Sequence, residues 1–107
     1  MRHPFGLLPV ATAAALLAAA AAQASPEESL NKAGCTGCHS KDQKIIGPAF
    51  KDVAAKYKGQ DAADKLVEKV RKGGAGSFGP VPMPPHPADR IGDAELKEAV
   101  TWILQQG

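Results

Sequence analysis

The sequence contains only two cysteines, few aromatic residues and no large excess of either charge. Two cysteines cannot supply a disulfide framework or a four-thiolate zinc site. The formal net charge is +2 and the lysines are interleaved with acidic residues, so nothing indicates nucleic-acid binding. The chain also lacks a convincing β-strand pattern, which argues against the βαβ setting of a thioredoxin-like dithiol. These absences leave a short chain whose two cysteines need an explanation.

The first 24 residues have the composition of a cleavable export signal. Arg2 provides a positive start, residues 7–22 are apolar and rich in alanine, and Ala-Gln-Ala at 22–24 matches the pattern before a cleavage site. We therefore expect cleavage before Ser25 and a periplasmic location. The alternative is an uncleaved membrane anchor, but the run is weakly hydrophobic and near the lower length limit for a span. Cleavage leaves residues 25–107, 83 of the 107 residues, as one domain with no membrane segment.

Helix signals recur along residues 25–107 and predict an all-α fold. Ser25, Pro26 and Glu28 combine a cap, a first-turn proline and a glutamate three residues after the cap, which is typical of a helix start. Asp61 is a suitable cap for a later helix. Apolar residues at helical spacing predict four helices. The first starts near residue 26, the second covers 49–57, and the third runs from Asp61 to just before Gly73. The last is capped by Asp93 or Gly92 and carries an apolar stripe from Leu96 to Leu104. The prolines and glycines of residues 73–87 predict an irregular, stiffened loop.

The run Cys35-Thr36-Gly37-Cys38-His39 carries most of the chemical information. This spacing is typical of covalent attachment of a c-type haem, with each thiol bound to a vinyl group and the histidine bound to the iron as proximal ligand. The alternatives are a redox dithiol, half of a zinc site, or a plain disulfide. Zinc is short of ligands, because His86 is the only other candidate beyond the run and adjacent Cys38 and His39 are poorly placed to chelate one ion. Covalent haem attachment is therefore the favoured interpretation of this run.

A second axial ligand is expected from the proline-rich loop. Met83 is the only methionine left after removal of the export signal, and Pro82 and Pro84 flank it. A thioether on a braced loop can be held against the far face of the iron, and His/Met ligation raises the reduction potential. The competing ligand is His86, which would give bis-histidine ligation and a lower potential. The packing alternative for Met83 is an adaptable core side chain, but cores rarely surround methionine with prolines.

Taken together, these motifs resemble the small bacterial class I monohaem cytochromes c. The resemblance rests on the Cys-x-x-Cys-His run, on residues 47–54 and 79–85, and on the last helix with Trp102. It implies a class I cytochrome c fold, in which four or so short helices enclose one covalent haem c and the first and last helices cross. It also implies that His39 and Met83 ligate the iron, and that the carbonyl oxygen of Pro48 accepts a hydrogen bond from His39.

Two positions depart from the pattern of that family. Phe78 stands where relatives often have a tryptophan that donates to a haem propionate, so we expect this hydrogen bond to be absent. His86 stands where relatives often have an asparagine near the methionine sulfur. On the third helix, Lys65 and Lys69 could reach a propionate, although solvated lysines on an outer face are the commoner case. Lys69 is kept as the candidate propionate partner.

One haem held by two strong ligands leaves no open coordination site, which favours electron transfer over catalysis. We expect a soluble periplasmic shuttle, not an enzyme, that passes single electrons to a reductase or terminal oxidase, the partners that the resemblance implies. Periplasmic redox proteins would dock weakly and transiently on the monomer. Two alternatives stay open: a haem subunit of a larger redox complex, and a gas sensor or enzyme in which Met83 leaves the iron.

Overall fold

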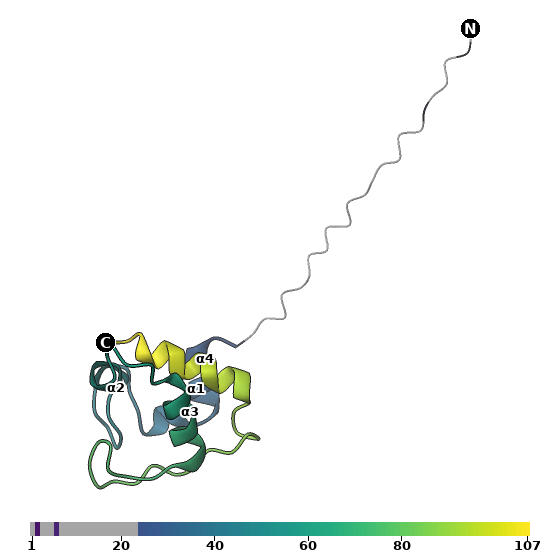
Figure 1. Ribbon diagram of the computed structural model, residues 1–107. Coiled ribbons are helices and arrows are strands. Elements are labelled where there is room, and N and C mark those ends of the chain that lie inside the picture. Colours follow the sequence, from purple (N-terminus) through teal and green to yellow (C-terminus); the bar gives the residue numbers. More distant parts are fainter. Residues whose placement is uncertain (1, 3–5, 7–23) are drawn as a thin grey trace.

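Figure 1 shows the computed structural model of the chain, which describes residues 2, 6 and 24–107. The expected export signal, residues 1–24, lies outside the described residues apart from residues 2, 6 and 24. Four α-helices and one short 3₁₀ helix follow one another along residues 24–107. They are α1 (Pro26–Lys32), η1 (Cys35–Gly37), α2 (Phe50–Lys56), α3 (Ala63–Lys72) and α4 (Asp93–Leu104). In this described part of the chain, no helix has the length and apolar character needed to cross a membrane.

The start of α1 agrees with the sequence signals. Ser25 is the N-cap, Pro26 occupies the first turn, and the Ser25 hydroxyl accepts a hydrogen bond from the backbone N–H of Glu28 at 3.2 Å. This bond satisfies one of the amides that the first turn of a helix leaves without an intrahelical partner. The predicted capping serine is therefore confirmed.

The start of α3 differs from the prediction. The N-cap is Ala62, and no side chain caps the helix, so the expectation of an Asp61 cap is wrong by one residue. Ala62 already has helical dihedral angles and is buried, and its carbonyl oxygen accepts the first bond, from the Leu66 N–H at 2.9 Å. Burial of the small alanine therefore sets the start of the helix, and the exposed Asp61 carboxylate comes one residue too early to reach the free amides.

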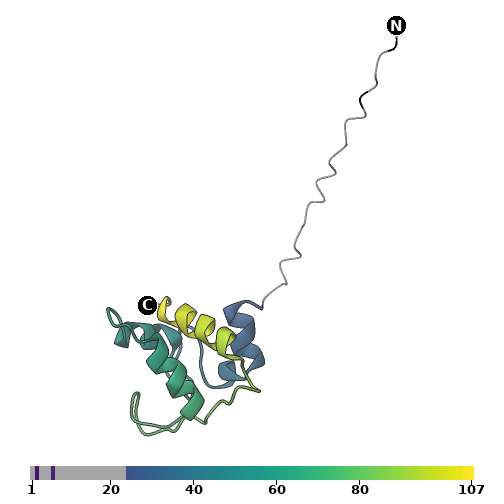
Figure 2. The ribbon, with the colours of Figure 1, turned by 45° about the vertical axis from the view of Figure 1, so that its right-hand side comes forward.

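Helix α4 is the centre of the packing, because it contacts α1, α2 and α3. The two views in Figures 1 and 2 show it crossing α1, as expected for the first and last helices. Its buried face carries Leu96, Ala99 and Val100, which join Leu30 of α1 and Phe50 of α2 in one core cluster. Trp102 lies at the edge of this face and meets the Phe50 ring edge-on, with ring centroids 5.9 Å apart.

The segment between α3 and α4 is irregular, as predicted. Its one pairing of strand type joins Gly74 and Met83, which exchange two backbone hydrogen bonds of 2.9 Å each. This exchange folds residues 74–83 back on themselves beside the core. The loop that carries Met83 is therefore anchored directly at the methionine backbone.

Candidate haem-binding site

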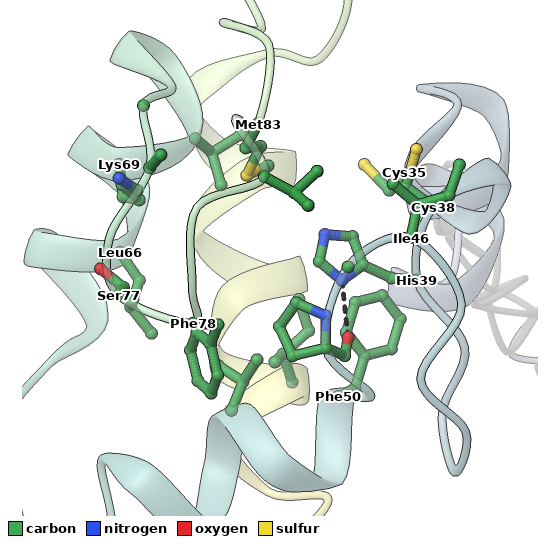
Figure 3. Close-up of a pocket in the computed structure, with 18 of the residues that line it drawn as sticks. Cys35, Cys38, His39, Ile46, Phe50, Leu66, Lys69, Ser77, Phe78 and Met83 are labelled. Carbon is green, nitrogen blue, oxygen red and sulfur yellow. Dashed lines mark hydrogen bonds between the residues drawn. The ribbon is translucent and has the colours of Figure 1, made fainter.

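The Cys-x-x-Cys-His run folds as one compact turn after α1. Gly34 has φ +85°, a left-handed conformation that suits glycine, and turns the chain out of the helix. The carbonyl oxygen of Cys35 then accepts hydrogen bonds from the N–H groups of Cys38 and His39, at 3.1 and 2.9 Å. Cys35, Cys38 and His39 all line the same cavity (Figure 3). Local geometry thus brings both thiols and the imidazole to one wall.

The imidazole of His39 is held by two neighbours. Its Nδ1 donates to the Pro48 carbonyl oxygen at 2.7 Å, and its ring stacks on Phe50 with 5.4 Å between centroids and 18° between planes. Because a carbonyl can only accept, Nδ1 carries a proton, and the neutral form of this ring therefore has its lone pair on Nε2. That nitrogen faces the cavity (Figure 3). A neutral imidazole with a fixed orientation is the form that binds a metal.

Gly47 makes room for this imidazole. A Cβ built on Gly47 would lie 2.5 Å from Cε1 and 2.9 Å from Nδ1 of His39, well inside normal contact. Its φ is not in the positive range, so the position needs glycine for space and not for its backbone conformation. Periodicity and capping signals do not reveal this requirement, because it comes from a contact between residues eight apart in an irregular segment.

Met83 lies on the opposite wall of the cavity. Figure 3 shows its sulfur turned toward the space that the free nitrogen of His39 also faces. Close packing fixes its backbone, since a Cβ on Gly73 would come within 2.5 Å of the Met83 carbonyl oxygen. Gly73 also has φ +70°, so both space and conformation favour glycine there.

The cavity between these walls has a volume of about 340 Å³. This is within the usual size of cofactor pockets. Its lining is mostly apolar and comes from all four helices and the loop, including Leu30, Phe50, Leu66, Leu96, Val100 and Ile103. Two thiols, one imidazole and one thioether converge on an apolar space, and this donor set fits a covalently attached haem with His/Met ligation.

His86 does not share this cavity. It is absent from the lining residues and is buried, with 8% of its surface exposed. Its Nδ1 is buried without a hydrogen-bond partner in the described structure, and its backbone N–H donates to the Val70 carbonyl oxygen at 2.9 Å. The geometry therefore favours Met83 over His86 as the side chain opposite His39.

The remaining predicted residues lie at the edge of the cavity. Lys69 is half-buried and lines it, which keeps Lys69 a candidate partner for a propionate, whereas Lys65 is exposed and absent from the lining. Phe78 is 40% exposed at the rim, and the ammonium group of Lys56 lies 4.5 Å from the centroid of its ring. Lys56 also donates to the Ser77 carbonyl oxygen. This cation therefore ties α2 to the rim.

The properties of the cysteines argue against the alternative chemistries. Burial raises the pKa of the Cys35 thiol above its ordinary value, whereas a redox-active cysteine usually has a lowered pKa. No disulfide joins Cys35 and Cys38 in this structure. Among the described residues no group of three or more His, Cys, Asp or Glu side chains is placed to hold a metal ion, so a zinc site lacks ligands.

Comparison with known proteins gives consistent matches. The family described as "Cytochrome C oxidase, cbb3-type, subunit III" matches residues 21–103. Cytochrome c2 of Rubrivivax gelatinosus is 49% identical over 83 residues, which are 77% of this chain and 98% of the relative. Cytochrome c-551 of Allochromatium vinosum is 57% identical over 74 residues, 68% of this chain and 77% of the relative. The crystal structure of Nitrosomonas europaea cytochrome c552 superposes with a TM-score of 0.69 at 39% identity, covering 76% of this chain and 99% of that one.

Proposed function

The chain belongs to the small class I monohaem cytochromes c, and we propose that it is a diffusible carrier of single electrons whose haem is attached through Cys35 and Cys38 and ligated by His39 and Met83. The protein holds one covalently attached haem c, because its two cysteines make up a single Cys-x-x-Cys-His motif. When bound, the haem iron gains and loses one electron.

The convergence of four donor side chains on one apolar cavity carries this proposal. The bond from His39 to Pro48 is the observation that supports the proximal ligand, since it fixes the tautomer and orientation that iron needs. The loop anchored at Gly74 supports Met83 as the second ligand. With both axial positions filled, no coordination site would be open to a substrate, so we propose that the protein is not an enzyme.

Localisation and domain boundaries follow from the sequence. We propose that residues 1–24 are removed as an export signal and that residues 25–107 are the cytochrome domain in the periplasm. The half-buried Lys69 and the carbonyl oxygen of Pro48 would respectively contact a propionate and orient the proximal ligand.

The partners are proposed to be periplasmic redox proteins that dock weakly on the monomer. Apolar side chains gather at the rim of the cavity, where Ile46, Phe78 and Val81 are 56%, 40% and 59% exposed. A small apolar contact of this kind suits a transient electron-transfer complex. The second candidate, a subunit of a larger redox complex, is favoured by the description of the matching family, which names an oxidase subunit. The near-complete coverage of a small cytochrome by this chain supports the free carrier.

Exported, matured protein tests the proposal directly. Mass spectrometry should find one haem per chain and an N-terminus at Ser25. The reduced protein should bind carbon monoxide poorly, whereas Met83→Ala should bind it readily, because the variant opens the sixth position. Ready binding by the unaltered protein would favour the sensor or enzyme alternative, and recovery of the protein only with a fixed partner would favour the complex subunit.

A further inference from the structure

The loop that presents Met83 has few backbone donors. Pro82, Pro84, Pro85 and Pro87 lack an N–H group, so this stretch cannot be held by an ordinary backbone ladder. The N–H of Met83 donates to Gly74, and the one further N–H of residues 84–87, that of His86, donates to the Val70 carbonyl oxygen at 2.9 Å. The chain beyond Met83 must therefore be fixed in part by side chains from elsewhere.

Arg71, at the end of α3, provides this fixation. Its Nη1 donates to the carbonyl oxygens of His86 at 3.2 Å and of Ile91 at 2.7 Å, and its Nη2 pairs with the carboxylate of Asp93 at 2.6 Å. The side chain is only 20% exposed. One guanidinium thus joins α3 to the returning loop, to the buried core residue Ile91 and to the first turn of α4.

The ordinary interpretation of a cation here is a favourable contact with the carboxyl end of a helix. Lys72 meets that description, because it lies in the same last turn, pairs with Glu68 on the same helix and is 73% exposed. Arg71 differs, since its acceptors lie 15 to 22 residues further along the chain. Two nitrogens of one planar guanidinium reach these three acceptors, whereas an ammonium presents its three donors from a single atom.

We propose that Arg71 is a positioning residue for the methionine ligand, holding the far side of the Met83 loop closed so that the sulfur stays on the iron. Arg71 does not line the cavity and does not touch the proposed ligands. It acts on the equilibrium between the closed loop and an opened loop from which Met83 has left. This role rests on the proposed His39/Met83 ligation.

Imidazole binding to the ferric holoprotein measures that equilibrium, because imidazole can take the sixth position only when Met83 leaves. Arg71→Gln should lower the imidazole dissociation constant about tenfold, which corresponds to about 1.4 kcal/mol of loop closure. In a Met83→Ala background, where no ligand needs to be displaced, the same substitution should leave imidazole affinity unchanged. Lys72→Gln removes a charge from the same turn and should have no effect in either background.

Arg71→Lys keeps the charge without the fork, and should lower the dissociation constant severalfold. This variant also keeps the test usable where Arg71→Gln fails to mature. Unchanged imidazole affinity in Arg71→Lys and Arg71→Gln, or an equal effect of Lys72→Gln, would overturn the role of Arg71. Imidazole binding by the unaltered protein as tight as that of Met83→Ala would instead refute Met83 ligation itself, so the two failures are distinguishable.

Discussion

Replacement of Gly47 by alanine tests whether the packing around His39 controls the site. The new Cβ would lie 2.5 Å from Cε1 of His39. The ring must therefore move by roughly 1 Å to reach ordinary contact. It cannot move freely, because Pro48 holds Nδ1 at 2.7 Å and Phe50 stacks on its face. Overpacking costs about 1–3 kcal/mol, and weakening the bond to Pro48 adds about 1 kcal/mol.

We expect Gly47→Ala to lose about 2–4 kcal/mol of stability, which lowers the Tm of a domain of this size by roughly 8–32 °C. The reduction potential should rise, because a weaker bond at Nδ1 makes the imidazole a poorer donor to ferric iron. Thermal unfolding and redox titration of the holoprotein measure both effects. Gly92→Ala is the matched control, since Gly92 also avoids positive φ, its Cβ would meet nothing within 4 Å, and it lies outside the haem-attachment run. Equal Tm and potential in the two variants would refute the reasoning.

Three further predictions concern the cofactor, the rim and a surface pair. Replacing both cysteines of the motif by alanine should abolish haem attachment and helical circular dichroism, because an apolar cavity of about 340 Å³ then stays unfilled in a domain too short to bury a large core of its own; a native, cooperatively melting chain would contradict this. Lys56→Ala should speed hydrogen exchange in the rim segment around Phe78, because it removes the bond and the cation that tie this segment to α2; unchanged exchange would show that the tie is unimportant. The hydrogen bond from Lys72 lowers the pKa of Glu68, so the stabilising contribution of this pair is present above the pKa of Glu68 in the unfolded chain and is lost as the pH falls through its lower value in the folded chain. In Lys72→Gln the pKa of Glu68 should return toward its ordinary range, which an NMR titration measures; the same Glu68 pKa in the variant and the unaltered protein would contradict the pairing.

Much of the fold could be predicted because local signals specify it. The serine cap of α1, the apolar spacing of α2 and α4, and the prolines of the loop each act over a few residues, and the structure agrees with them. The Asp61 cap is wrong because burial of Ala62 outweighs local capping preference at the start of α3. Local preference decides a boundary only where packing does not.

The site shows the same division. The run from Cys35 to His39 and the isolated Met83 are visible in the sequence, because thiols at that spacing are typical of haem attachment and histidine and methionine are typical ligands of haem iron. Gly47 and Arg71 are not, since their roles depend on contacts across irregular segments that no periodicity records. Likewise, the sequence left open that His86 is the second ligand, and only its burial outside the cavity argues against this alternative.

The most direct test of the central claim is the absorption spectrum of the matured ferric protein, compared with those of Met83→Ala and His86→Ala. His/Met ligation predicts the weak far-red band that marks a bond between methionine sulfur and ferric iron. The band should be present in the unaltered protein and in His86→Ala, and absent in Met83→Ala. A protein without the band, with a low-spin spectrum that changes only in His86→Ala, would contradict the account and assign the second ligand to His86.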